Sequence, residues 1–244
     1  MGKLSKLASN APEAVEKETD SLGGFQVYES DVYDVTLRDP YLMESAGGAL
    51  GLVCKFEGDD INLKHTFYVT NRNGDTYYIN KKTGGSHYLQ GYNQANALSM
   101  FGCKGKTIDE LVDEPKVLNV YDSEAGKEIP TEVDYVSELD GINVKLCIIK
   151  QTVNKNKKVE SNGKVSYVPT EETKEENDID KILSYKSGKT VNEIQNKEEA
   201  TYLDLWLGKW KGKTKDRTKK ITGGNGVAGK PGGNKKKVDL FADE

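Results

Sequence analysis

The chain has 244 residues, of which 35% are hydrophobic and 30% charged, with a formal net charge of −4 and a mean hydropathy of −0.70. This balance predicts a folded, water-soluble protein rather than a disordered or fibrous one. No apolar run reaches the roughly 18 residues of a membrane span, the first residues lack a secretory apolar stretch, and the three cysteines form no CxxC pair. We therefore expect a cytoplasmic protein without disulfides, and no membrane partner.

Charge is strongly segregated along the chain. Residues 208–238 carry eleven Lys and Arg against one acid, whereas residues 1–207 have a net charge of −11. A stretch this rich in Gly and Lys buries little apolar area, so we expect 208–238 to be a flexible basic linker. The linker ends in an acidic tip, residues 239–244. Basic segments commonly meet polyanions, and the alternative is a tail that only increases solubility.

The first predicted element is a short amphipathic helical arm over residues 1–22. Alternating apolar and polar residues then predict strands over residues 33–38, 50–56, 63–69, 76–79, 117–121, 144–153 and 165–168. Asn71–Gly74 has the composition of a hairpin turn, and residues 154–163 read as a lysine-rich hairpin. We expect helices over 93–101 and 108–112, and a last one with Leu203, Leu207 and Trp210 on the same face as Ala200.

About six short strands with one inserted helix indicate a mainly β domain over residues 23–207. The pattern is that of a Greek-key barrel, for which the OB-fold is a common small example. A β-sandwich would give a similar string of strands, so the two architectures stay open at this point.

Residues that would form a catalytic or metal site do not occur in a suitable pattern. The only histidines are His65 and His87, and His65 shares its alternation face with apolar residues, which indicates an inward side chain. Cys54 and Cys147 fall inside strands as small core residues. A zinc site built from both histidines, Cys54 and Cys103 lacks the usual ligand spacing. The sequence therefore predicts no enzyme, no cofactor and no metal.

Tyrosines and basic residues recur together on the predicted strands and turns. Single-stranded nucleic acid is bound in this way, because bases stack on aromatic rings while Lys and Arg neutralise phosphates. The predicted nucleic-acid-binding residues are Lys64, Tyr68, Arg72, Tyr77, Tyr78, Lys81, Lys82, Tyr88, Tyr92, Lys150 and Lys155. Because Tyr77 and Tyr78 are adjacent on a strand, we expect one to face the groove and the other the core. The alternative is that most of these tyrosines fill the barrel.

Several short segments carry a resemblance to a known family. They are Thr19-Asp-Ser-Leu-Gly-Gly24, Tyr41-Leu-Met-Glu-Ser45, Gly74-Asp-Thr-Tyr-Tyr78, Lys82-Thr-Gly84, Leu89-Gln-Gly-Tyr-Asn93 and Tyr167-Val-Pro-Thr170. Over residues 1 to about 210 and the acidic tip, the chain resembles the single-stranded DNA-binding proteins of short-tailed bacteriophages, an OB-fold group.

The resemblance implies a non-catalytic viral protein that coats single-stranded DNA during replication and recombination in the host cytoplasm. It also implies that the acidic tip recruits replication proteins such as a polymerase, a helicase or the host RNA polymerase. The tip residues concerned are Asp239, Leu240, Phe241, Asp243 and Glu244. Two other readings stay open, namely a structural or assembly module with a basic arm that docks on a genome, and an RNA-binding regulator.

Overall fold

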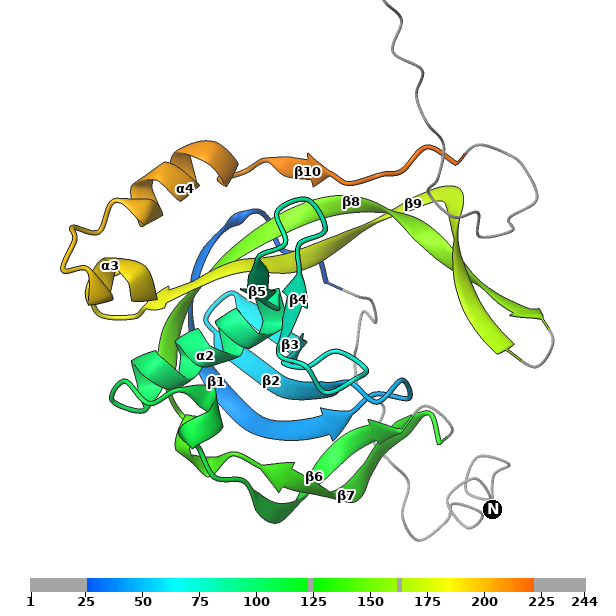
Figure 1. Ribbon diagram of the computed structural model, residues 1–244, viewed down its shortest axis with the longest axis horizontal. Helices are drawn as coiled ribbons and strands as arrows, with labels where there is room; N and C mark the ends of the chain where they lie inside the picture. The colour runs from blue at the N-terminus through cyan, green and yellow to red at the C-terminus, as the bar shows by residue number, and fades with distance from the viewer. Residues whose placement is uncertain (1–25, 123–124, 162–163, 222–244) are drawn as a thin grey trace, which may run out of the picture.

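The structure is a computed structural model that describes residues 26–122, 125–161 and 164–221. The helical arm expected over 1–22, most of the basic linker and the acidic tip lie outside the described residues. The fold is mainly β, as the sequence predicts, and is dominated by one large sheet (Figure 1).

Five long strands form the body of this sheet in the order β9-β8-β1-β2-β3, each antiparallel to its neighbours. They are β1 (Asp31–Glu44), β2 (Leu50–Gly58), β3 (Ile61–Tyr68), β8 (Asn143–Ser161) and β9 (Lys164–Ser184). Inward residues such as Leu37, Phe56 and Phe67 alternate with outward ones and are fully or almost fully buried. The period-2 pattern therefore predicted β1, β2 and β3 correctly.

The remaining elements pair with these five strands, cover them or extend from them. They are β4 (Tyr77–Ile79), β5 (Ser86–Tyr88), α2 (Gln90–Gly102), η1 (Ile108–Glu110), β6 (Glu114–Asp122), β7 (Lys127–Tyr135), η2 (Ser137–Leu139), α3 (Val191–Gln195), α4 (Tyr202–Trp210) and β10 (Thr214–Asp216). The hairpin β6–β7 joins the sheet where β7 pairs with the end of β1. The helix expected over 93–101 is confirmed as α2, and it buries Ala95 and Leu98 in the main core.

A second, smaller core lies under the C-terminal helix. Trp206 of α4 packs with Cys147, Ile149 and Leu183 of β8 and β9, and its indole Nε1 donates a hydrogen bond to Asp180 Oδ2 at 2.8 Å. The expected amphipathic face of this helix is confirmed, because Leu203, Leu207 and Trp210 all pack against the same cluster.

Three expectations about the strands need correction. The lysine-rich hairpin expected over residues 154–163 is the end of a longer one, because β8 and β9 have 19 and 21 residues and pair through this segment (Figure 1). The Asn71–Gly74 turn forms, but β4 then pairs with β5 instead of returning along β3. Residues 208–216, expected to begin the linker, include the end of α4 and all of β10, which pairs in parallel with β8. No helix among the described residues is both long and apolar enough to cross a membrane.

Candidate nucleic-acid interface

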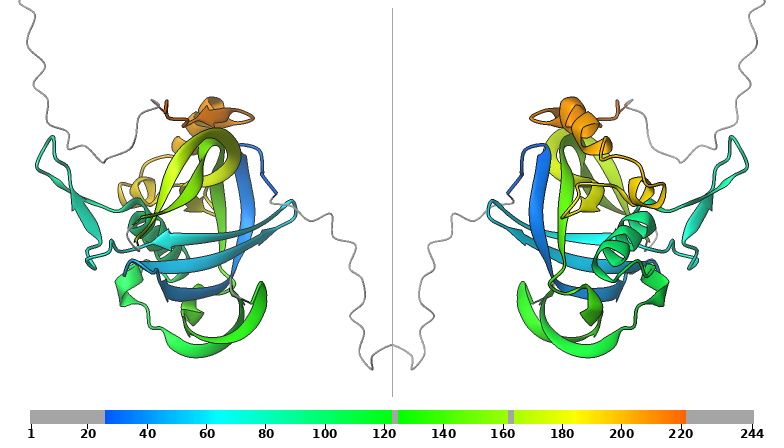
Figure 2. Two further views of the ribbon diagram at one scale, coloured as in Figure 1. Left: turned by 90° about the vertical axis from the view of Figure 1, so that its right-hand side faces the viewer. Right: turned by 90° about the vertical axis from the view of Figure 1, so that its left-hand side faces the viewer.

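The two strands β4 and β5 form a separate ribbon that projects from the body (Figure 2). In its register Tyr77 faces Tyr88 and Tyr78 faces His87. The exposed fractions of Tyr77, Tyr78 and Tyr88 are 43%, 50% and 57%. The expectation that either Tyr77 or Tyr78 is a core residue is therefore wrong, because a two-stranded ribbon without a covering layer leaves both of its faces in solvent.

Two lysines lie in the turn that joins the strands of the ribbon. Asn80 Oδ1 accepts the backbone N–H of Lys82 at 2.9 Å, and Gly84 adopts a positive φ of 73°, a region that favours glycine. Lys81 and Lys82 are exposed and make no ion pair within the described part of the chain. The ribbon thus combines exposed aromatic rings with two cations whose charge is uncompensated by a neighbouring carboxylate.

At the base of the ribbon, three of the tyrosines predicted to bind nucleic acid, Tyr68, Tyr88 and Tyr92, lie close together at the start of α2. The rings of Tyr88 and Tyr92 stack with centroids 4.8 Å apart, and the Tyr92 hydroxyl donates to Asp109 Oδ1 at 3.1 Å. Burial, together with this bond, raises the pKa of Tyr92. At Gly91 a Cβ atom would clash with the backbone oxygen of Tyr68, so glycine allows the helix to touch the end of β3.

Lys64 and Arg72 lie outside the ribbon, on β3 and in the turn that follows it. Lys64 is on the outer face of β3, where its Nζ lies 5.8 Å from the centre of the Tyr41 ring, in a groove of about 640 Å³ beneath β6–β7. The sequence did not single out Tyr41 or Lys55 as binding residues, although both line this groove. Strand pairing brings them there, because Lys55 pairs with Lys64, and Tyr41 pairs with Val53 of β2. Arg72 is exposed in the turn after β3.

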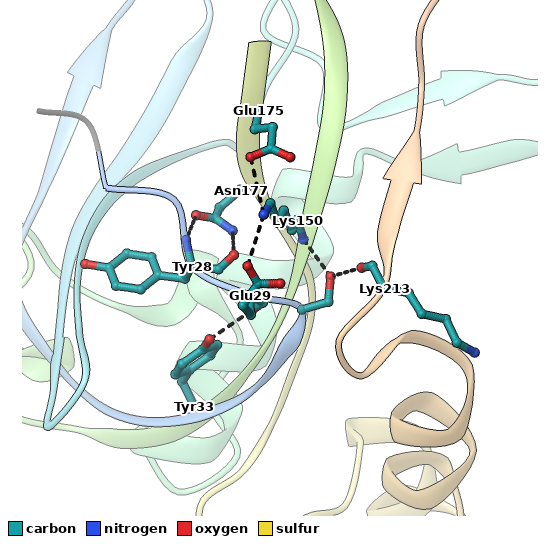
Figure 3. Close-up of polar contacts among 8 residues, drawn as sticks. Tyr28, Glu29, Tyr33, Lys150, Glu175, Asn177 and Lys213 are labelled. Atoms are coloured by element: carbon teal, nitrogen blue, oxygen red, sulfur yellow. Dashed lines mark hydrogen bonds and ion pairs between the residues drawn. The ribbon is translucent and has the colours of Figure 1, made fainter.

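Lys150 and Lys155 are on the long β8–β9 hairpin, and both already have acidic partners. Lys150 Nζ lies 3.0 Å from Glu29 Oε1 and 3.3 Å from Glu175 Oε2, and only 17% of its side chain is exposed (Figure 3). Lys155 Nζ lies 3.1 Å from Glu172 Oε2. A phosphate would have to displace these carboxylates to bind either lysine. Both lysines therefore differ from those of the ribbon, because they lie on another hairpin and because neighbouring carboxylates already compensate their charge.

Burial shifts the pKa of His65 and Cys147, two titratable side chains of the sheet. Burial lowers the pKa of His65 to about 4 and raises that of Cys147 to about 12. His65 is therefore neutral at pH 7, and its ring packs 4.6 Å from that of Phe67, which confirms the predicted inward face. His87, absent from the predicted site, lies on the ribbon 5.7 Å from the Tyr78 ring. Among the described residues, no three His, Cys, Asp or Glu side chains gather as metal ligands.

Comparisons with family models, with curated proteins and with solved structures found no match for this chain.

Proposed function

We propose that the protein is a non-catalytic single-stranded DNA-binding protein that coats displaced strands during DNA replication and recombination, as the resemblance to the phage proteins implies. The observation that carries this proposal is the β4–β5 ribbon, where Tyr77, Tyr78 and Tyr88 are exposed beside two lysines that make no ion pair with any described residue. Large aromatic rings on a projecting ribbon cost free energy in water, and stacking with unpaired bases offsets that cost.

The sheet order supports an OB-fold within this proposal. Strands β1, β2, β3, β8 and β9 would be its five strands, and α2 follows the third strand and contacts both β3 and β9 at the two edges of the sheet. OB-folds bind oligonucleotides on the face of their second and third strands and on the loops beside it. Lys64 and Tyr68 lie on the outer face of β3, and Tyr68 continues this face toward the ribbon.

In the mechanism that we propose, bases stack on the ribbon tyrosines and on Tyr68 and Tyr92. Phosphates then contact Lys81, Lys82 and Arg72, with Lys64 extending the cationic path. The acidic charge of the rest of the body disfavours wrapping of duplex DNA, because its phosphates would approach carboxylates on most sides. Binding of this kind tolerates any sequence, since every base has a face that can stack.

The acidic tip, from Asp239 through Leu240 and Phe241 to Glu244, lies outside the described residues. We propose that it recruits replication proteins such as a polymerase, a helicase or the host RNA polymerase, by pairing its carboxylates with basic partner surfaces.

The test is a fluorescence-anisotropy titration of the full chain with labelled 15- and 40-nucleotide single strands, a duplex and an RNA, at two salt concentrations. The proposal predicts salt-sensitive binding to single-stranded DNA and much weaker binding to the duplex. Tighter binding to RNA of equal length would favour an RNA-binding regulator. No binding to any of these nucleic acids would contradict the proposal and favour an assembly module that uses its tyrosines as protein contacts.

A further inference from the structure

A groove of about 620 Å³ runs between the ribbon with α2 on one side and β9 with α3 on the other. The right-hand view of Figure 2 shows α2 and α3 next to each other, with the ribbon extending beyond them. Tyr78 and Tyr88 line the groove on the ribbon side, and Ala97 and Ile182 also border it, with exposed fractions of only 8% and 1%. Its volume is within the range of about 300–1,000 Å³ in which proteins hold small ligands.

The two helices line this groove with amide side chains. Gln90 and Asn93 are one turn apart on α2, and Asn192 and Gln195 are one turn apart on α3. All four residues are exposed, and none of the four amides has a hydrogen-bond partner among the described residues.

Two neighbouring amides of α2 behave differently, because they serve the fold. The buried Gln94 donates through Nε2 to the backbone oxygen of Ile179 and ties the helix to β9. Asn96 accepts the backbone N–H of Ile108 at 3.1 Å. All six amides border the groove, but within the described part of the chain only the four exposed ones lack a hydrogen bond, and each presents a donor and an acceptor side by side.

We propose that this groove binds an unstacked nucleobase of the bound strand and contacts its edge through the free amides. The inference rests on the proposed function and deepens it, because it adds base recognition to sequence-independent stacking. Asn and Gln amides form paired hydrogen bonds with base edges, and unstacked bases in single strands offer those edges freely. Tyr78 and Tyr88 belong to both the ribbon and the groove, so a strand stacked on the ribbon has an adjacent place for its next base.

The charge of the groove favours a base over a charged ligand. Its only ionisable carboxylate and ammonium groups are Asp180 and Lys181, which follow each other on β9. Asp180 accepts the Trp206 indole N–H, and the Lys181 ammonium lies 5.9 Å from the Tyr202 ring. Phosphates are instead expected at Lys81 and Lys82, outside the groove, which leaves a neutral, amide-lined space for the base.

The experiment compares the affinities of the full chain for labelled 15-nucleotide dT, dC and dA homopolymers. The variants are Asn93→Ala/Gln195→Ala in the groove, and Asn156→Ala as a matched control, an exposed amide on β8 that is not part of the groove. We expect the unmodified chain to prefer one homopolymer by at least about fivefold, the lower end of what one paired amide–base contact contributes. The groove variant should lose this preference while it still binds all three strands, and the control should keep it.

The outcomes separate this inference from the proposed function. Equal binding of the three homopolymers by the unmodified chain would overturn base recognition and leave strand binding intact. Unchanged preference in the groove variant would also overturn it, and would leave the groove to another ligand such as a peptide. Failure of the unmodified chain to bind any single strand would instead contradict the proposed function itself.

Discussion

At the scale of single residues, the β4–β5 ribbon exposes the rings of Tyr77 and Tyr78 beside the ammonium groups of two lysines in its turn. The recurrence of Tyr with Lys predicts Tyr77, Tyr78, Lys81 and Lys82 as binding residues, because these residue types suit single-stranded nucleic acid. The pattern did not show that both tyrosines are exposed, since strand alternation normally buries one face. Nor did it show the acidic partners of Lys150, because Glu29 and Glu175 are far from it in sequence.

The ribbon tyrosines are expected to contribute directly to the affinity for single-stranded DNA. Tyr77→Ala or Tyr88→Ala should weaken binding by a factor of about 5–150, since one base stack contributes about 1–3 kcal/mol. Anisotropy titrations measure this change. Tyr121→Ala is the matched control, because Tyr121 is 58% exposed on β6, away from the ribbon strands. An equal loss in both variants would show that the ribbon has no special role.

The lysines are expected to differ in how they change the salt dependence of binding. Lys81→Ala/Lys82→Ala should reduce the log–log salt slope by about 0.7 for each single-strand phosphate that the variant no longer neutralises. Lys150→Ala should leave the slope unchanged, because this ammonium is paired with two carboxylates and mostly covered. A larger change of slope for Lys150→Ala than for the ribbon variant would contradict the assignment.

Among the elements, the sequence predicts well those that bury one face, and it does not give the extent or the pairing of strands that bury neither. β1, β2, β3 and α2 pack on the main core, so their apolar residues recur with the period of a strand or a helix. The distal half of the β8–β9 hairpin has no such period. Its residues 155–160 and 171–175 are all exposed, because this part of the hairpin is only two strands wide. The pairing of β4 with β5 was missed for the same reason, as all six of its residues are exposed.

A buried carboxylate joins the last two helices and gives a pH-dependent prediction. Glu193 accepts backbone N–H groups of Thr190 at 2.8 Å, Thr201 at 2.9 Å and Tyr202 at 2.8 Å. Burial by itself raises the pKa of Glu193, but these hydrogen bonds outweigh it, so its pKa in the folded chain is lowered. The carboxylate therefore stabilises the fold above its unfolded-state pKa, and this contribution is lost as the pH falls through the lower folded-state value.

Glu193→Gln turns one acceptor oxygen into a donor that faces backbone N–H groups. At pH 7 we expect its free energy of unfolding to fall by about 1–3 kcal/mol, and the difference from the unmodified chain to shrink below about pH 4. Urea unfolding at pH 7 and below about pH 4 measures this difference in the free energy of unfolding. Glu172→Gln, at an exposed surface pair, should change stability by less than about 0.5 kcal/mol. A Glu193→Gln effect that does not depend on pH would contradict the account.

At the scale of the whole molecule, hydrogen bonds attach the C-terminal segment, residues 212–217, to the sheet. Gly212 N donates to the backbone oxygen of Ser30 at 2.8 Å, and Ser30 Oγ both donates to Lys213 O and accepts Lys150 N. Arg217 N then donates to Thr152 O at 2.9 Å. Composition alone predicted that this segment belongs to the linker. The sequence could not show that it is folded, because β10 is only three residues long and the groups that bond to it are distant in sequence.

Truncation tests where the folded part ends. A chain that ends after residue 221 should keep the melting temperature of the full chain, because β10 and its bonds remain. A chain that ends after residue 207 loses β10 and the last turn of α4 and leaves the buried Ser30 without its partners from this segment. Its melting temperature should fall by about 4–10 °C. Equal melting temperatures for both truncations would show that the segment 208–221 does not stabilise the fold.

The central claim is that the β4–β5 ribbon contacts the bound strand, and photo-crosslinking tests it most directly. The full chain would be irradiated on a single-stranded oligonucleotide that contains 5-iodouracil, and the adducts would be located by mass spectrometry. We predict adducts at Tyr77, Tyr78 or Tyr88, the exposed aromatic residues of the ribbon. Adducts confined to Tyr121 or to the β8–β9 hairpin at Tyr167, with none on the ribbon, would contradict the account.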